Sequence, residues 1–297
     1  MITIFSAFIL LSSAVLAKKL ALKAFSPLLF VGLRALPAGI MIIAMNIKKF
    51  KNYTWRQIKS DMPSLILVSI LTALLPAFLK AYAIKYMPAS KAVLLSSTGP
   101  FVTAFYAYIL FSETISLQKI FGILVGMLGT FALLTSTTPL EEALKTWSIF
   151  SLPELAGLAA VFASRYGWLK IQKIVRTKKY QPIEINGIIM TISGLAALSL
   201  AVFMGKVQIH NVRNLSAPIF ALLYAIIGGN ILGYTFYTKA LKKHSATFVS
   251  LCSFSVPILV SIGAFFLFRE PITTNLIFSG CLIFAGIVIF HTKNLTQ

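Results

Sequence analysis

The residues that could do chemistry are cations, aromatic rings and hydroxyls set inside long apolar runs. Arg165 lies about 12 residues into the run 152–174, roughly 18 Å along a helix and near the middle of a bilayer. Insertion scales place the cost of a central arginine at about 2.5–3.5 kcal/mol, so it should face water, a partner or a ligand. A guanidinium pairs well with a carboxylate or phosphate, which predicts an anion contact. The alternative is that Arg165 extends to the membrane surface with Lys170 and Lys173.

Other polar and aromatic side chains lie in similar runs. Asn230, Tyr234 and Tyr237 follow Gly228-Gly229 at positions i, i+4 and i+7, which share one helix face. Such a face suits an amphipathic ligand, but contact between helices or placement of the tyrosines at the membrane interface would also explain it. Lys80, in the run 64–87, could line the mouth of a cavity or could extend to the membrane surface. The predicted substrate-binding residues are Arg165, Tyr166, Trp168, Lys80, Tyr82, Ser96, Ser253, Asn230, Tyr234 and Tyr237.

Two prolines interrupt predicted helices at matching places. Pro100 and Pro257 cannot donate to the carbonyls four residues earlier, which belong to Ser96 and Ser253. Each freed carbonyl stands beside a hydroxyl, so either local capping by the serine or substrate contact is open. The symmetry of placement favours a shared mechanical role, and we predict that both prolines act as hinges.

Several kinds of chemistry have no support in the sequence. The apolar runs carry no central Asp, Glu or His, so the usual carboxylate proton relay is absent, and exchange or facilitated diffusion is favoured over proton coupling. Phosphate-binding glycine loops, metal-spaced His/Cys sets and nucleophile elbows are also absent. We therefore expect no enzyme, no cofactor and no metal.

The amino-acid composition indicates whether the elements that position these residues lie in water or in a lipid bilayer. The chain is 58% hydrophobic and 11% charged, with a mean hydropathy of +0.88, far outside the range of soluble domains. Because a helix needs about 20 apolar residues to cross a bilayer, the pattern predicts ten membrane helices. Their expected ranges are 2–22, 27–47, 64–87, 89–111, 117–137, 152–174, 185–205, 216–238, 246–268 and 274–291.

The chain contains an internal duplication. Residues 83–113 align without a gap to residues 240–270, and ten of the 31 positions are identical, including Lys85/Lys242, Ser96/Ser253, Pro100/Pro257 and Glu113/Glu270. Five spans per copy is an odd number, so the second copy should enter the membrane upside-down relative to the first. Inverted repeats of this kind are typical of transporters that alternate between inward-facing and outward-facing states.

Charge indicates the orientation. The longest basic loops, 47–61 and 170–181, should be cytoplasmic, with both termini on the same side, although Lys18, Lys19 and Lys23 oppose this assignment. The net charge of +20 is explained by topology and by contacts with anionic lipids rather than by nucleic acid.

The duplicated motifs resemble the EamA-type branch of the drug/metabolite transporter superfamily. The pattern A-x-K-x-x-x-A-S/T, Ser-x-x-x-Pro, L-F-x-E and a glycine-bearing helix occurs in both copies, and Phe30 to Arg34 matches the family's F-x-x-x-R. The resemblance implies ten helices, cytoplasmic termini, and a cavity lined by helices 1, 3, 4, 6, 8 and 9. It also implies export or exchange of small metabolites, most commonly amino acids. The sequence departs from the family where a Trp-Gly/Ala pair is common: Leu11-Ser12 and Arg165-Tyr166 stand there.

These observations lead to one predicted organisation and function. We expect an all-α integral membrane protein with two inverted five-helix repeats, 1–138 and 150–292, in a bacterial inner membrane, as a monomer or homodimer. It should carry a small organic metabolite, most simply an amino-acid-like zwitterion or anion, by alternating access. Transport of nucleotide-type or cationic drug-like metabolites, or passive conduction by a channel, are the alternatives.

Overall fold

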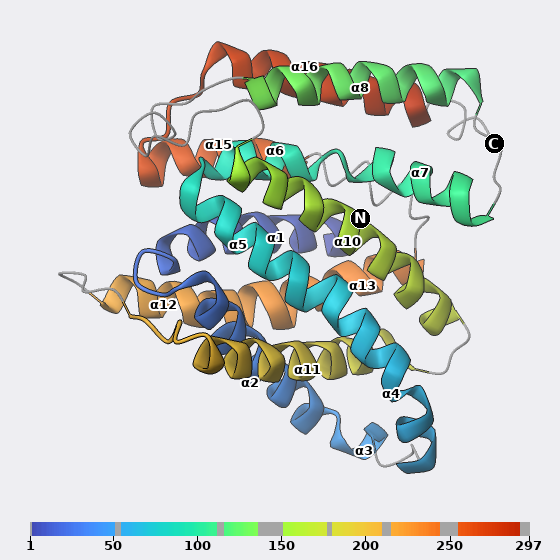
Figure 1. Cartoon of the computed structure of the whole chain (residues 1–297), viewed down its shortest axis with the longest axis vertical. Coiled ribbons are helices and arrows are strands. Elements are labelled where there is room, and N and C mark those ends of the chain that lie inside the picture. The colour runs from blue at the N-terminus through green and yellow to red at the C-terminus, as the bar shows by residue number, and fades with distance from the viewer. Residues whose placement is uncertain are drawn as a thin grey trace.

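The computed structural model describes residues 2–50, 55–111, 116–135, 151–176, 180–209, 215–243 and 255–291, and nearly all of them are helical (Figure 1). The N-terminal half contains α1 (Ile2–Ala21), α2 (Pro27–Met45), α3 (Ile47–Phe50), α4 (Trp55–Ser69), the π-helical turn η1 (Ile70–Leu74), α5 (Leu75–Tyr86), α6 (Ala89–Ser96), α7 (Gly99–Phe111) and α8 (Leu117–Thr135). The C-terminal half contains α10 (Leu152–Arg176), α11 (Pro182–Phe203), α12 (Ser216–Tyr224), the π-helical turns η2 (Ala225–Gly233), α13 (Tyr234–Lys243), α15 (Ser255–Phe268) and α16 (Thr274–His291).

The helices follow the apolar runs, with two differences from the expected ranges. The run expected at 64–87 starts earlier, because α4, η1 and α5 continue one another from Trp55 to Tyr86. The run expected at 89–111 is two helices, because the chain turns at Ser97 and Thr98, just before Gly99 and Pro100. Among the residues that the structure describes, five helical stretches are long and apolar enough to cross a membrane: Ile4–Ala21, Pro27–Met45, Lys59–Tyr86, Pro182–Phe203 and Ser216–Tyr237. Shorter apolar helices accompany them, and the ten-helix count stays a prediction.

Local chemistry explains where the paired helices α2 and α11 begin and end. Pro27 and Pro182 occupy first-turn positions, where a missing N–H costs nothing. Glu184 accepts a hydrogen bond of 2.7 Å from the backbone N–H of Gln181, which completes a capping box at the start of α11. Gly205 ends the same helix with a φ of 61°, the left-handed conformation that glycine adopts without a steric penalty.

The two halves pair helix by helix. The helices α8 and α16 lie side by side at one end of the molecule, and α2 and α11 lie together toward the other (Figure 1). Glycines allow this approach: a Cβ on Gly286 would lie 2.6 Å from the carbonyl oxygen of Gly122. Small residues are the usual means of close helix packing in membranes, where the hydrophobic effect between helices is lost.

The start of α2 meets the end of α11. The Ser26 hydroxyl donates to the carbonyl of Lys206 at 2.6 Å, and Phe25 forms an isolated antiparallel bridge with Ile209. The two helices therefore run in opposite directions. The first helix of each half also packs on the third and fourth spans of the other half, α1 on η2, α13 and α15, and α10 on η1, α5 and α7. This arrangement is compatible with the inverted duplication that the sequence predicts, which itself stays a prediction.

The π-helical segments occupy corresponding places in the two halves. Shifting η1 by the 157 residues that separate the aligned copies gives 227–231, which lies inside η2. Each segment is crossed closely by the first helix of the other half: a Cβ on Gly233 would lie 3.1 Å from the Leu11 side chain, and a Cβ on Gly167 would lie 3.1 Å from the Leu71 backbone. Because π-bulges are frequent at functional sites, we expect a functional site near these two crossings.

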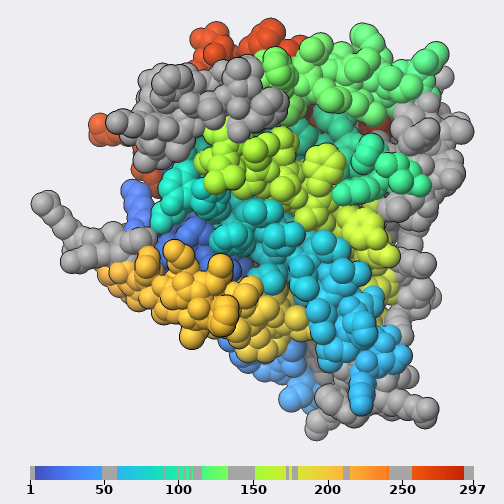
Figure 2. All heavy atoms as spheres, viewed as in Figure 1, coloured from blue at the N-terminus to red at the C-terminus, as the bar shows by residue number. Residues whose placement is uncertain are grey.

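The outer surface is apolar. Large side chains such as Phe121, Leu128, Phe220 and Phe266 are exposed at 59, 63, 70 and 76%. In the space-filling view, residues of α8, α10, α5 and α12 succeed one another across the visible face (Figure 2). Exposed apolar surface of this extent belongs against lipid, and the chain is a multi-pass membrane protein.

Candidate functional site

Four cations on four different helices act on one another near the crossings. Lys18 on α1 interacts electrostatically with Arg34 on α2 and with Lys80 on α5, and Lys80 interacts with Arg165 on α10. All four side chains are half-buried, so each keeps part of its surface accessible. Like charges held together inside a membrane protein need water or an anion between them.

The backbone at the break between α6 and α7 lies directly against Arg165. Its guanidinium occupies the space beside Gly99 into which a Cβ would project. A proline follows at position 100, so α7 cannot continue the hydrogen-bond ladder of α6 across the break. The predicted hinge and the predicted anion-binding residue are therefore neighbours.

Arg34 is held by Asn230. One Arg34 N–H group donates to the Asn230 side-chain oxygen, and the Asn230 amide donates to the Arg34 carbonyl at 3.3 Å. Arg34 is the eighth residue of α2, and these contacts join it to η2. Its buried Nε has no hydrogen-bond partner among the described residues.

An aromatic group borders the cations. Trp168 on α10 stacks on Tyr234 with ring centroids 6.5 Å apart and planes 14° apart, and it meets Tyr237 edge-on at 5.7 Å. Tyr237 interacts electrostatically with Arg165, and Arg34 with Tyr234. The predicted set thus contributes Arg165, Lys80, Trp168, Tyr234 and Tyr237 to one region.

The other predicted residues have different surroundings. Tyr166 packs on Tyr106 of α7 at 5.6 Å, Tyr82 packs on Tyr86 at 4.8 Å, and Asn230 binds Arg34 as described above. The Ser96 hydroxyl donates to the carbonyl of Ala92 at 3.1 Å and not to the Ser96 carbonyl that Pro100 leaves free, so the choice between capping and substrate contact stays open. Pro257 is buried near the start of α15. Ser253, and Glu113, which aligns with Glu270 in the duplication, lie outside the described residues.

The described carboxylates are engaged away from this cluster. Glu154 pairs with Lys91 at 2.6 Å and Glu270 with Lys19, while Glu184 caps α11. Asp61 accepts a hydrogen bond of 2.9 Å from Tyr180. The positive charge of the cluster is therefore not neutralised by any of these described acids.

Sequence reasoning missed Lys18 and the pair of Lys91 and Glu154. Lys18 stands in the last turn of α1, where a lysine reads as a topology determinant. Lys91 and Glu154 are opposite charges near the starts of spans in different halves, but nothing in their spacing predicts that they meet.

Comparison with known proteins assigns the chain to a family. A model of the EamA-like transporter family matches residues 1–135 and 151–292. The chain belongs to the EamA-like transporter family. Its two matched segments coincide with the two halves that pair across the structure, and the protein is therefore a membrane transporter rather than an enzyme.

Curated relatives of this EamA-like transporter cover nearly its whole length. An S-adenosylmethionine/S-adenosylhomocysteine transporter of Chlamydia muridarum is 26% identical over 97% of this chain and 90% of its own. The transporter of that name in Chlamydia trachomatis serovar L2 is 26% identical over 97% and 88%, and an uncharacterised transporter of Clostridium kluyveri is 24% identical over 96% and 88%.

A solved structure shares the fold of this EamA-like transporter. It superposes with a TM-score of 0.66 at 16% sequence identity, covering 100% of this chain and 98% of its own. At that identity the likeness concerns the fold alone. Together, family and relatives make this a transporter of small metabolites.

Proposed function

We propose that the protein exchanges a small organic metabolite across a bacterial inner membrane by alternating access, and that the metabolite is amino-acid-like with an anionic group. The single observation that carries the proposal is the cluster of Lys18, Arg34, Lys80 and Arg165, whose members interact with one another but pair with none of the described carboxylates. A carboxylate placed among them would relieve their repulsion and form charge-assisted hydrogen bonds.

The aromatic group suggests a second feature of the substrate. Trp168, Tyr234 and Tyr237 offer ring faces and edges beside the cations, which favours a ligand with a flat apolar part. A nucleoside joined to an amino acid, the chemistry in the names of the Chlamydia relatives, has both a ring and a carboxylate. S-adenosylhomocysteine has no net charge at neutral pH, while S-adenosylmethionine carries an additional sulfonium cation that the cluster would repel.

A nucleotide-type substrate is the second candidate. A single carboxylate would neutralise only part of the positive charge of the four cations, and a phosphate group would neutralise more of it. Both candidates require the same cluster, so competition between ligands has to separate them.

Alternating access rests on the pairing between the two halves. Helices that cross in matched pairs, α1 on η2 and α10 on η1, can exchange their packing between two similar states. The absence of central acids in the apolar runs favours exchange over proton coupling.

Counterflow into proteoliposomes tests the proposal. Vesicles loaded with unlabelled S-adenosylhomocysteine should accumulate the radiolabelled compound, and uptake should saturate. External S-adenosylhomocysteine and amino acids should compete better than S-adenosylmethionine. Stronger competition by nucleotides would favour the second candidate, and better competition by S-adenosylmethionine or cationic drugs would contradict an anion site. Flux that follows voltage without saturating would indicate a channel.

A further inference from the structure

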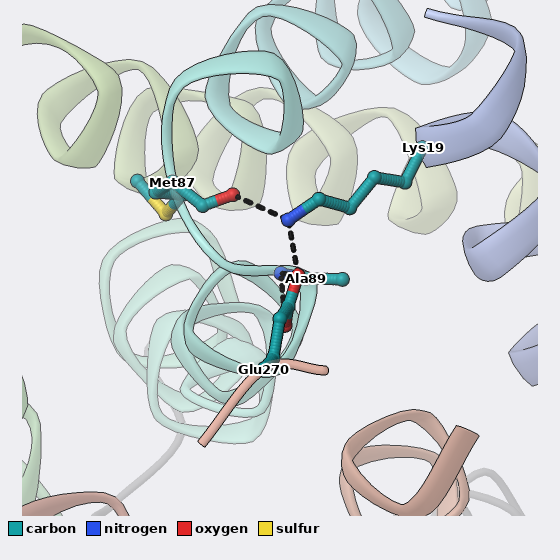
Figure 3. A network of polar contacts seen from close by, with 4 residues as sticks. All are labelled: Lys19, Met87, Ala89 and Glu270. Carbon is teal, nitrogen blue, oxygen red and sulfur yellow. Dashed lines mark hydrogen bonds and ion pairs between the residues drawn. The ribbon is translucent and has the colours of Figure 1, made fainter. Parts of the chain in front are cut away.

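A carboxylate from the other half of the chain binds the backbone at the start of α6. Both oxygens of Glu270 accept hydrogen bonds from the backbone N–H of Ala89, at 3.3 and 3.1 Å, and Glu270 forms an ion pair with Lys19 (Figure 3). Lys19 also donates to the carbonyl of Met87 at 3.3 Å. One side chain beyond the end of α15 thereby holds both α1 and the first residue of α6.

The backbone after α15 is shaped to present Glu270. Arg269 has a φ of 53°, which is uncommon for a residue with a Cβ. The N–H of Glu270 bonds to the Ala264 carbonyl at 3.3 Å and that of Arg269 to the Phe265 carbonyl at 3.1 Å. This pattern closes the helix and turns the chain back toward α6.

A second carboxylate holds the same first turn of α6. Lys91 and Glu154 form an ion pair at 2.6 Å with both side chains only 2% exposed. The other Glu154 oxygen accepts a hydrogen bond from the Ser151 backbone at 2.9 Å, which fixes the carboxylate at the start of α10. The pair is fully enclosed and joins the two halves a second time.

Both contacts lie at the same end of the molecule and bear on one short element. The end of α1, the starts of α6 and α10 and the end of α15 meet there, whereas α6 leads at its other end to Gly99 and Arg165. Displacement of α6 would therefore change the backbone against which the guanidinium rests.

We propose that a latch closes the transporter at this end and must open in each transport cycle. The latch consists of the ion pairs Lys19–Glu270 and Lys91–Glu154 and of the contact between Glu270 and the N–H of Ala89. This inference rests on the alternating access of the proposed function, but on none of its substrate assignments. The charges are desolvated while the latch is closed and hydrated when it opens. Removing one partner takes an ion pair away from the closed state only, so the population shifts toward the open state.

Cysteine accessibility measures that shift without any substrate. Ser97, half-buried at the break between α6 and α7, is replaced by Cys in a background with Cys252→Ser and Cys281→Ser. A membrane-impermeant maleimide is applied to vesicles of each orientation. Glu154→Gln and Glu270→Gln should each raise the labelling rate from the latch end about tenfold, equivalent to ~1.4 kcal/mol, and lower it from the opposite side.

Two matched variants separate a latch from a merely structural contact. Glu184 is as buried as Glu154 but caps a helix within its own half, so Glu184→Gln should leave the labelling rates on both sides unchanged. Lys91→Met combined with Glu154→Met replaces the ion pair by apolar contact and should return labelling toward the parent value.

The inference is overturned if Glu154→Gln and Glu270→Gln elute as folded, monodisperse protein and label at the parent rate. It is equally overturned if labelling rises on both sides, because that result indicates loosened packing. Failure of the counterflow assay with these shifts intact would contradict the substrate assignment alone.

Discussion

Arg165 has the clearest test at the scale of single residues. Its guanidinium can form two parallel hydrogen bonds with a carboxylate, whereas an ammonium at the same place cannot. We expect Arg165→Lys to bind the substrate more weakly and Arg165→Ala to lose about 1.5–3 kcal/mol of binding free energy, the scale of a hydrogen bond to a charged group. Equilibrium binding to purified protein checks this, with thermal stability measured in parallel. Unchanged affinity and turnover in well-folded Arg165→Ala would make Arg165 a topology residue.

Gly99 offers a way to move Arg165 without replacing it. Because the guanidinium fills the space of a Cβ at this position, Gly99→Ala should displace Arg165 and weaken binding in the same direction as Arg165→Lys. Gly157→Ala on α10 is the matched control, since its new Cβ would lie 3.5 Å from Leu95, an ordinary contact. Binding isotherms for both variants decide the matter. Equal affinity of the two variants would show that the Gly99 contact does not position the guanidinium.

Asn230 illustrates how a residue's role depends on its partner. Its place on the face of Tyr234 and Tyr237 favoured substrate contact, but its side chain is 1% exposed and bonded at both ends to Arg34. A buried amide satisfied in this way positions a cation and has little surface for a ligand.

At the scale of elements, the break between α6 and α7 is where we expect motion. Replacing Pro100 with Ala provides an N–H for the Ser96 carbonyl and would favour one continuous helix through Ser97 and Thr98. We expect Pro100→Ala to slow turnover and to leave substrate affinity within about tenfold, or ~1.4 kcal/mol. Steady-state exchange rates and binding constants check this together.

Pro257→Ala should act in the same way, an expectation that rests on the aligned sequence because residues 251–254 lie outside the described part of the chain. A large loss of affinity with normal turnover in either variant would assign the proline to binding instead.

The π-helical segments are a second device at this scale. A π turn widens the helix by one residue and weakens its hydrogen-bond ladder, and both segments lie where the first helix of the other half crosses. Their symmetric placement indicates that the two crossings share a mechanical design.

At the scale of the whole molecule, the antiparallel pairing of α2 and α11 leads to a prediction of topology. Lys48 follows α2 and Lys206 follows α11, and both are exposed. Because the helices run in opposite directions, single cysteines at these positions should label with an impermeant reagent from opposite sides, Lys48→Cys from the cytoplasm. Labelling assays on intact and everted vesicles check this. Reaction of both positions from one side would exclude the inverted arrangement of the two halves.

Much of the architecture follows from the sequence alone. Apolar runs about 20 residues long require membrane helices, because the bilayer leaves backbone groups no partner outside the helix. The ten identities between 83–113 and 240–270 indicate a duplication without reference to any tertiary contact. The depth of Arg165 and the shared face of Tyr234 and Tyr237 were likewise readable, because rise and rotation along a helix are regular.

The tertiary structure decided which of these side chains meet. Tyr166 and Trp168 are two positions apart and so point in different directions from one helix, toward Tyr106 and toward Tyr234 respectively. Lys18, Arg34, Lys80 and Arg165 come together, and Lys91 finds Glu154, only because helices from both halves cross at particular rotations. Those rotations depend on close approaches such as Gly122 against Gly286 and Gly233 against Leu11. The rotation at which two helices cross depends on the residues of both, so it cannot be predicted from the sequence of either helix alone.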